Sequence, residues 1–468
     1  MPRSITPEET AHIDELVARG RAALQQFEHA TQAEVDRLSQ AVAWAVANEE
    51  TFTRLAHMGV EESGIGDPQS RVGKRFKIMG ILRDVLRQKS TGIIEELPDK
   101  GIVKYAKPVG LIASLVPTTN PELTPPGVGL FAIKCRDAVI FSPHPRSKNT
   151  TRETVAIMRR ALEREGAPVD LIQCVELPSI PSAQYLMSRA DMVQATGGRD
   201  MVKAAYSSGT PAYGVGAGNS TMVIDETADV REAARNTRIS KTSDFGSGCS
   251  SDGNLIVEDS IYDALRDNLV TEGGHLATPD EAAKLKAVLW DDEGRRTADT
   301  IAISAQSLAG KAGFEVASDR RFILVEQSEI GDHNPFSSEK LGLVLSMFRY
   351  QGFEEALEKV TAIYEVGGKG HSCGIYSFDD DHIDRLAHVA PVSRIMVRQP
   401  QSKANAGAFN NGMPMTSSLG CGTWGGNITS ENIHLKHYMN VTWVSRPITE
   451  DRPSEQELFG DFYGTPVD

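Results

Sequence analysis

The sequence predicts an α/β protein built from two doubly wound parallel domains. From residue 109 onward, short apolar runs typical of buried strands alternate with helical segments, as in successive β-α-β units. Polar loops rich in Pro, Thr and Gly follow several of these strands, and the carboxyl ends of parallel strands form ligand crevices. The 468 residues are enough for two ordinary cores. We therefore expect two domains, one of which binds a dinucleotide.

Helices and a hairpin are expected before the first strand-helix unit. Thr6-Pro7-Glu8-Glu9 and Thr31-Gln32-Ala33-Glu34 both have the capping-box pattern that starts a helix, and apolar residues recur on one face after each. A further helix is expected over residues 71–87. Residues 92–108 predict two strands around a Pro-Asp-Lys-Gly turn. We expect this hairpin to contribute to an oligomer contact.

The strand-helix units divide the rest of the chain. Strands are expected over residues 111–116, 138–141, 171–175 and 192–195, and a second α/β region begins at residue 221. No G-x-G-x-x-G fingerprint follows the early strands, so a nucleotide is held in another way. The expected domains are a nucleotide-binding domain (1–217), a catalytic thiol domain (218–415) and a final segment (416–468). The final segment returns to the nucleotide-binding domain and supplies an oligomerisation strand and a tail.

Composition excludes several classes of function. The net charge is −14 and no block of Lys and Arg stands out, which argues against nucleic acid or an anionic membrane as partner. Neither a signal peptide nor a membrane-spanning run is apparent, so we expect a cytoplasmic protein. The five cysteines are odd in number and lack Cys/His ligand spacing, which indicates a reducing compartment and no metal. Small molecules are the expected partners.

One glycine-rich loop has the features of a catalytic centre. Residues 243–251 read Ser-Asp-Phe-Gly-Ser-Gly-Cys-Ser-Ser, so Cys249 lies among small polar residues rather than apolar ones. We expect the chain here to run into a helix, whose free N–H groups would lower the pKa of the thiol. Cys249 is therefore the candidate nucleophile. The alternative is a buried cysteine that behaves as a small apolar residue.

Several long motifs resemble the aldehyde dehydrogenase superfamily, and in particular its CoA-acylating branch. The resemblance covers roughly residues 30–444. Over this range the chain resembles the aldehyde dehydrogenase half of bifunctional alcohol/acetaldehyde dehydrogenases. The motifs that carry it are Val116-Pro117-Thr118-Thr119-Asn120-Pro121, Phe141-Ser142-Pro143-His144-Pro145-Arg146, Ala195-Thr196-Gly197-Gly198, Met201 to Gly209, Gly214-Val215-Gly216-Ala217-Gly218-Asn219, Glu339-Lys340-Leu341 and Leu419 to Asn427.

The resemblance implies the roles of the catalytic residues. Cys249 takes the position of the nucleophile that attacks the aldehyde carbonyl. Asn120 takes that of the amide that, with the backbone N–H of Cys249, stabilises the oxyanion of the thiohemiacetal. His371 matches a histidine of the acylating branch that would accept the proton of the CoA thiol; the alternative is a histidine satisfied by loop hydrogen bonds.

The resemblance also implies a nicotinamide cofactor, NADP or NAD. Pro145 stands near the position where many NAD-preferring relatives outside this branch have a carboxylate, and Arg146 is close by, so NADP is permitted and favoured. Glu339 matches the residue that holds the nicotinamide ribose. The full set of expected cofactor-binding residues is Thr118, Ser142, His144, Pro145, Arg146, Thr196, Gly197, Gly198, Gly216, Glu339 and Leu341.

Val215 is the most informative departure from the family. Hydrolytic members have a glutamate at this position, which deprotonates the water that cleaves the enzyme thioester. Without that general base, the acyl group stays on Cys249 until a better nucleophile arrives, and a thiol such as coenzyme A is suitable. We therefore expect CoA as co-substrate and acyl-CoA as product.

Arg398 and Lys403 suggest an anionic aldehyde. A guanidinium at the mouth of an aldehyde channel would pair with a sulfonate, phosphonate or carboxylate. The pattern resembles acylating sulfoacetaldehyde dehydrogenases, which form sulfoacetyl-CoA; an Arg that pairs structurally with a neighbouring acid is the alternative. Leu123 to Pro126, and the Gly342-Leu343 pair, depart from the usual family pattern near the pocket.

Other functions remain open. Within enzymes, the alternatives are an acylating acetaldehyde or propionaldehyde dehydrogenase and a hydrolytic aldehyde dehydrogenase, which Val215 disfavours. Outside enzymes, a non-catalytic assembly protein of the same fold is possible, although intact Cys249 and Asn120 argue against it. A homodimer or homotetramer is expected by analogy with the family.

Overall fold

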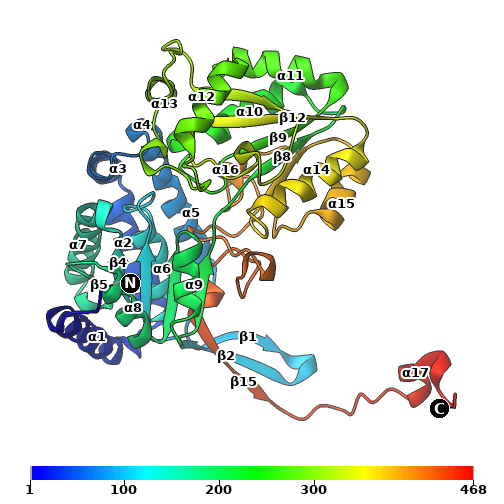
Figure 1. The fold of residues 1–468 in the computed structure, drawn as a ribbon. Helices are drawn as coiled ribbons and strands as arrows, with labels where there is room; N and C mark the ends of the chain where they lie inside the picture. The colour runs from blue at the N-terminus through cyan, green and yellow to red at the C-terminus, as the bar shows by residue number, and fades with distance from the viewer. Residues whose placement is uncertain (1–2, 467–468) are drawn as a thin grey trace.

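The computed structural model describes residues 3–466 and contains three β-sheets (Figure 1). Two of the sheets are parallel and flanked by helices, and they lie in separate parts of the molecule. The third sheet is small and antiparallel, and it projects from the body. The predicted α/β class with two parallel domains and a hairpin is confirmed.

The first parallel sheet has five strands in the order β5-β4-β3-β6-β7. Its strands are β3 (Leu111–Val116), β4 (Ala138–Pro143), β5 (Ile172–Cys174), β6 (Met192–Thr196) and β7 (Ala212–Val215). From β3 the chain adds strands on one side, and then it adds β6 and β7 on the other. The strand order therefore reverses between β3 and β6, and the crevice beyond the carboxyl ends of these strands is where such sheets bind ligands.

The helices in this half of the described chain are α1 (Pro7–Phe27), α2 (Gln32–Ala47), α3 (Glu49–Ser63), α4 (Pro68–Arg71), α5 (Arg75–Leu86), α6 (Thr124–Cys135), α7 (Lys148–Arg164), α8 (Ile180–Arg189) and α9 (Arg199–Tyr206). The predicted capping boxes start α1 and α2, where Thr6 and Thr31 accept the backbone N–H of Glu9 and Glu34. The single helix expected over residues 71–87 is instead α4, a 3-10 turn (Val72–Lys74) and α5.

Helix α6 is the structural centre of the first domain. All 12 of its residues are buried, and it packs against α2, α5 and α7. A helix that is apolar on every side is stable only when protein surrounds it completely, and this sequence meets that condition. The loop that carries Asn120 lies between β3 and α6, so both of its ends are held by buried elements.

The second parallel sheet has seven strands in the order β10-β11-β12-β9-β8-β13-β14. Its strands are β8 (Thr221–Ile224), β9 (Asn254–Glu258), β10 (Gly274–Leu276), β11 (Phe322–Gln327), β12 (Val344–Tyr350), β13 (Cys373–Tyr376) and β14 (Ile395–Val397). Its helices are α10 (Val230–Thr242), α11 (Asp259–Thr271), α12 (Pro279–Leu289), α13 (Ala305–Ala312), α14 (Phe353–Val366), α15 (Asp380–Val389) and α16 (Gln401–Ala404).

The antiparallel sheet joins the predicted hairpin to the end of the chain. It consists of β1 (Ile93–Leu97), β2 (Ile102–Pro108) and β15 (Met439–Ser445), with β2 in the middle. The turn ends at Gly101, whose φ of +63° favours glycine. Beyond β15 the chain leaves the body and ends in a short helix, α17 (Glu455–Phe459) (Figure 1).

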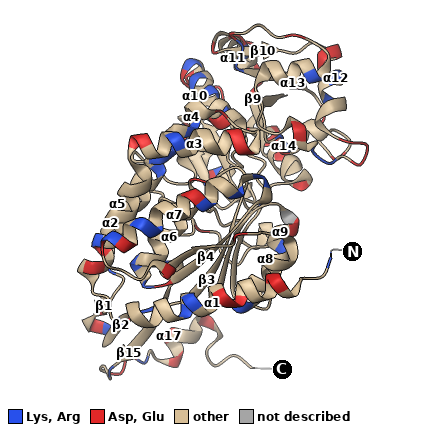
Figure 2. Cartoon of the chain, turned by 90° about the vertical axis from the view of Figure 1, so that its left-hand side faces the viewer, with Lys and Arg blue, Asp and Glu red and all other residues tan. Residues whose placement is uncertain are grey.

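Lys and Arg residues alternate with Asp and Glu residues along the ribbon in Figure 2, and neither sign dominates one part of this view. This mixed distribution accompanies the net charge of −14. Among residues 3–466, no helix combines the length and the apolar character needed to cross a bilayer.

Candidate active site

Cys249 lies in the loop between a 3-10 turn (Ser243–Gly246) and β9, at the amino edge of the second sheet. The glycine-rich run before β8 packs directly against this loop. A Cβ at Gly218 would lie 2.0 Å from the carbonyl oxygen of Cys249, so only glycine fits there. Ser220 Oγ donates to the same oxygen at 3.2 Å. The segment just before β8 therefore holds the backbone of the predicted nucleophile in place.

His371 is in direct contact with the candidate nucleophile. Its Nε2 lies 3.1 Å from Cys249 Sγ, and its Nδ1 lies 2.8 Å from Ser372 Oγ. The ring is fully buried, and its loop is fixed because Arg394 donates to the His371 carbonyl at 2.8 Å. Ser372 Oγ in turn contacts Ser220 Oγ at 3.1 Å. These hydrogen bonds fix the orientation of the ring relative to the sulfur.

Burial determines the protonation of this pair. Burial, reinforced by the Glu339 and Cys421 side chains, raises the pKa of Cys249 to about 12. Burial, reinforced by the Arg394 guanidinium, lowers the pKa of His371 to about 3. At neutral pH the pair is thus a thiol beside a neutral imidazole. The unprotonated nitrogen of the ring can accept a hydrogen bond from the S–H group.

The expectation of a lowered thiol pKa is wrong in this state of the protein. Cys249 is followed by a loop and by β9, so the helix that we expected to begin directly after it is not there in the described chain. The small polar flanks permit close packing by the His371 and Cys421 loops, and the resulting burial disfavours the thiolate. Nucleophilic attack therefore requires transfer of the thiol proton to a base in contact with the sulfur, and His371 meets this condition.

Asn120 is held from its oxygen side by Lys74. Lys74 Nζ lies 2.7 Å from Asn120 Oδ1 and 2.7 Å from Asp244 Oδ2. Asp244 stands five residues before Cys249, so Lys74 connects the predicted oxyanion donor to the nucleophile loop. Since an ammonium only donates, Asn120 Oδ1 faces it, and Asn120 Nδ2, which makes one long contact of 3.5 Å to Thr119 Oγ1, has a second N–H to offer a substrate oxygen.

Glu339 lies beside the same loops. Its Oε1 accepts the backbone N–H of Gly218 at 3.1 Å, and burial raises its pKa to about 8. Leu341 follows with a φ of +43°, an uncommon conformation for a non-glycine residue. The structure thus brings Glu339 together with the Gly218 segment that supports Cys249.

The remaining predicted cofactor residues gather at one edge of the first sheet. Because β3, β4, β6 and β7 are parallel, the residues at and beyond their carboxyl ends lie along the same edge. This edge includes the reversal of strand order between β3 and β6. The residues concerned are Thr118, Ser142, His144, Pro145, Arg146, Thr196, Gly197, Gly198 and Gly216.

Arg398 and Lys403 occupy different environments. Arg398 follows β14, at the carboxyl edge of the second sheet; its Nη1 donates to Ser377 O at 3.1 Å and its guanidinium covers the Phe378 ring. Cys249 and His371 precede β9 and β13 at the opposite edge, so the structure does not bring Arg398 to them. Lys403, in α16, donates to Ser243 Oγ at 2.7 Å and therefore lies beside the nucleophile loop.

Three residues that complete this site were not identified from the sequence. Lys74 sits in a 3-10 turn that the sequence pattern presented as part of a helix. Asp244 belongs to the nucleophile loop, but its partners precede it by more than 150 residues. Arg394 stands four positions before Arg398, on the other side of β14, and its Nη1 holds the His371 loop.

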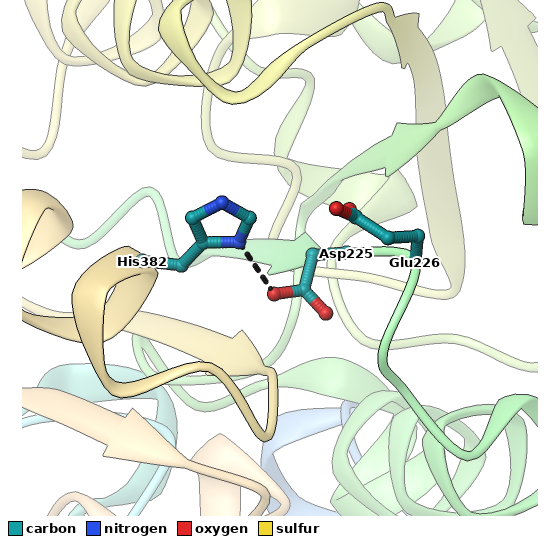
Figure 3. A group of neighbouring side chains, drawn as sticks. All are labelled: Asp225, Glu226 and His382. Atoms are coloured by element: carbon teal, nitrogen blue, oxygen red, sulfur yellow. Dashed lines mark hydrogen bonds and ion pairs between the residues drawn. The ribbon is translucent and has the colours of Figure 1, made fainter.

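One group of potential metal ligands occurs among the described residues, formed by Asp225, Glu226 and His382 (Figure 3). His382 Nδ1 bonds to Asp225 Oδ2 at 2.8 Å, and Thr227 donates twice to the other oxygen of Asp225. The His382 ring also stacks on Phe353. Hydrogen bonds and packing account for this group, and we assign it no metal.

Comparison with known proteins identifies the family of this chain. The family described as "Aldehyde dehydrogenase family" matches residues 4–438. A sulfoacetaldehyde dehydrogenase of Acholeplasma sp is 46% identical over 95% of this chain and 93% of its own length. An acylating sulfoacetaldehyde dehydrogenase of Bilophila wadsworthia is 40% identical over 96% of this chain and 97% of its own.

A solved structure extends the agreement to the fold. An acetylating aldehyde dehydrogenase of Geobacillus thermoglucosidasius superposes with a TM-score of 0.92 at 34% identity, over 96% of this chain and 99% of that chain. The resemblance inferred from the motifs is confirmed, and the chain belongs to the aldehyde dehydrogenase family.

Proposed function

We propose that this chain oxidises sulfoacetaldehyde to sulfoacetyl-CoA, as an NAD(P)-dependent, CoA-acylating aldehyde dehydrogenase. The observation that carries the proposal is the contact between a half-buried Cys249 and a fully buried His371, combined with a valine at position 215. The pair can form and release a thioester, whereas Val215 offers no base to activate water. The relatives named above support both the acylating reaction and the sulfonated substrate.

The first step is attack of Cys249 Sγ on the aldehyde carbon. The S–C bond forms as the thiol proton passes to His371 Nε2, and the carbonyl π electrons move to oxygen. Asn120 Nδ2 and the backbone N–H of Cys249 stabilise this oxyanion. One such donor contributes on the order of 3 kcal/mol in the transition state.

A nicotinamide nucleotide fits the crevice at the carboxyl edge of the first sheet. A Cβ at Gly198 or Gly216 would meet no neighbouring atom, so the backbone there borders open space that a ligand can approach closely. Thr118, Thr196 and Glu339 offer polar groups around it. When bound, the nucleotide accepts the hydride from the thiohemiacetal carbon. NADP is favoured because residue 145 is Pro and Arg146 lies beside it.

Coenzyme A completes the reaction as co-substrate. The proton that His371 took from Cys249 passes to solvent as the net proton released by the oxidation. His371 then accepts the proton of the CoA thiol, and the CoA thiolate attacks the acyl carbon. The bond between that carbon and Cys249 Sγ breaks, and His371 returns a proton to the cysteine. Val215 is buried in strand β7, where a water-activating carboxylate is absent, so thiolysis is favoured over hydrolysis.

The sulfonate is best matched by Lys403. Among the described residues, no carboxylate lies within ion-pair distance of Lys403, and its side chain remains exposed beside Ser243. Burial and the nearby Lys74 ammonium lower the pKa of Lys403. A bound anion would offset the repulsion between the two ammonium groups. The Arg398 guanidinium is occupied by Ser377 O and Phe378, and we keep it as the weaker candidate.

We also propose a homodimer or homotetramer. Strand β15 is at the edge of its sheet, and Val441, Trp443 and Val444 on it are exposed. Unpaired edges with apolar side chains are typical of surfaces that associate.

The test is reduced-nucleotide formation with sulfoacetaldehyde and, separately, acetaldehyde, each with and without CoA, and with NAD or NADP. We expect CoA-dependent turnover of sulfoacetaldehyde, little turnover of acetaldehyde and no turnover by Cys249→Ala. Preference for acetaldehyde or propionaldehyde would overturn the substrate. Free acid formed without CoA would overturn the acylating reaction, and no acyl group on Cys249 by mass spectrometry would favour a non-catalytic protein.

A further inference from the structure

Lys74 uses all three of its ammonium hydrogens within the candidate site. Its Nζ donates to Thr119 O at 2.9 Å, to Asn120 Oδ1 at 2.7 Å and to Asp244 Oδ2 at 2.7 Å. An ammonium has three donors and no acceptor, so these contacts saturate it. The amide of Asn120 therefore has one orientation, with its oxygen towards Lys74 and its nitrogen directed away.

Asp244 is held in an uncommon conformation by the same contacts. Asp244 and Phe245 have φ values of +49° and +50°, a region that non-glycine residues occupy only at a cost. Arg71 donates to the Asp244 carboxylate through Nε and Nη2, and Ser247 Oγ, two residues before Cys249, donates to Oδ2 at 2.7 Å. The carboxylate thus fixes the turn that leads into the nucleophile loop.

The network beside Asn120 contains two cations and two carboxylates, namely Arg71, Lys74, Glu122 and Asp244. Burial alone would raise the pKa of Asp244, but Lys74 and Arg71 hold it below its usual value, so the carboxylate is charged. Burial raises the pKa of Glu122, whose oxygens accept no hydrogen bond among the described residues. Glu122 Oε1 also lies 3.9 Å from Arg71 Nε, so Arg71 stands between two carboxylates, whereas Lys74 is the cation that contacts Asn120.

We propose that Lys74 is a positioning residue that orients and polarises the Asn120 amide for oxyanion stabilisation. A cation 2.7 Å from the amide oxygen draws electron density towards that oxygen and makes the N–H a stronger donor. The same ammonium ties the amide to the loop of Cys249, so donor and nucleophile keep a fixed relative position. This role applies to whichever aldehyde the enzyme oxidises.

A double-mutant cycle tests the proposal. Lys74→Met, Asn120→Ala and the double variant are compared by kcat/KM for reduced-nucleotide formation with the aldehyde that the wild-type enzyme oxidises best. We expect Lys74→Met to lose about 30-fold in the Asn120 background and less than twofold in the Asn120→Ala background, because Lys74 acts through Asn120. An equal loss in both backgrounds, or no loss in the first, would overturn the proposal.

Two further variants separate positioning from folding. Lys74→Gln keeps a donor without the charge, and we expect it to recover part of the loss, with the same dependence on Asn120; it replaces Lys74→Met if that variant does not fold. Lys77→Met is the matched control, because Lys77 donates to backbone carbonyls of residues 406 and 407 and does not contact Asn120. Any loss that it causes should be equal in both Asn120 backgrounds. A loss from Lys77→Met that also vanishes in Asn120→Ala would overturn the assignment to Lys74.

Discussion

The two sides of the candidate site handle charge in opposite ways. On one side, the half-buried Cys249 and the fully buried His371 are neutral, with a pKa of about 12 for the thiol and about 3 for the imidazole. On the other, Lys74, Arg71 and Asp244 are charged and fixed by mutual hydrogen bonds. A proton must move on the first side during attack, whereas the second side must keep its charges in place. On the first side, burial keeps the His371 imidazole unprotonated, so that it can accept a proton. On the second side, the fixed ions provide a permanent electrostatic field.

The largest effect is expected when the proton acceptor is removed. His371→Gln keeps the volume of the side chain but cannot take a proton, so the thiol of Cys249 has no adjacent base. We predict about a 10³-fold slower formation of the acyl-enzyme, measured as the single-turnover burst of reduced nucleotide. A burst within about threefold of wild type would show that another group deprotonates Cys249.

The reactivity of the thiol with pH sharpens the same point. Because the pKa of Cys249 is about 12, the thiolate fraction of the unliganded enzyme rises about tenfold per pH unit through neutrality. We therefore predict that the rate of alkylation by iodoacetamide climbs from pH 7 to pH 10 without a plateau. A plateau near pH 7 would show that the pKa of Cys249 is lowered, as the loop sequence predicted.

A second test of the Cys249–His371 side displaces the backbone of the Cys249 loop. A Cβ at Gly218 would lie 2.0 Å from the carbonyl oxygen of Cys249, so Gly218→Ala must push the two segments apart. We predict about a 100-fold loss in kcat/KM, since small misplacements of reacting groups are costly. Gly253→Ala is the matched control, because its Cβ would meet nothing closer than 3.5 Å. Equal effects of the two variants would exclude close packing as the cause.

Mild acid should weaken the neutral side before it affects the charged side. The pKa of His371 is about 3 in the folded protein, against an ordinary value of 6.5, so the unfolded chain binds the extra proton as pH falls below 6.5. The contribution of the neutral His371 to the free energy of unfolding is therefore complete above pH 6.5, and about 2 kcal/mol of that free energy is lost by pH 5. The pKa of Asp244 is lowered, so its contribution decreases only at more acidic pH.

Urea unfolding of wild type and His371→Gln at pH 8, 7 and 5 measures this loss. We predict that the difference in free energy of unfolding between the two proteins is constant from pH 8 to pH 7. It should then shift by about 2 kcal/mol against the wild type at pH 5. A difference that stays constant down to pH 5 would mean that His371 is not held neutral by burial.

Local pattern and long-range contact explain which parts of the site could be predicted. Strand β3 spans Leu111–Val116, the run that the sequence indicated, and Cys249 was selected from its own flanking residues. The thiol pKa could not be predicted locally, because the His371 and Cys421 segments that bury the sulfur stand more than 120 residues away. Lys74 was missed because its turn lies inside an apparently continuous helix and its partner Asp244 is 170 residues distant.

The substrate residues illustrate the same limit. Arg398 and Lys403 were both candidates in the sequence, and only the direction of β14 separates them. That strand carries Arg394 at its amino end beside His371, and Arg398 follows its carboxyl end against Phe378. Lys403 then returns on α16 to the nucleophile loop. A side chain's distance along the sequence does not reveal which edge of a parallel sheet it reaches.

The smallest predicted effect concerns the charged side of the site, where the Lys403 ammonium is available to bind a substrate anion. Lys403→Met keeps the apolar stem and removes the ammonium, so we predict about a tenfold rise in KM for sulfoacetaldehyde, with kcat within about twofold, because one charge-assisted hydrogen bond is lost. The KM for acetaldehyde should not rise, since that substrate has no anionic group. Arg398→Met is the matched control, and we expect it to change neither KM by more than twofold. If Arg398→Met selectively impaired turnover of the sulfonate and Lys403→Met did not, the anion would be held at the carboxyl edge of the second sheet, and Lys403 would not bind it.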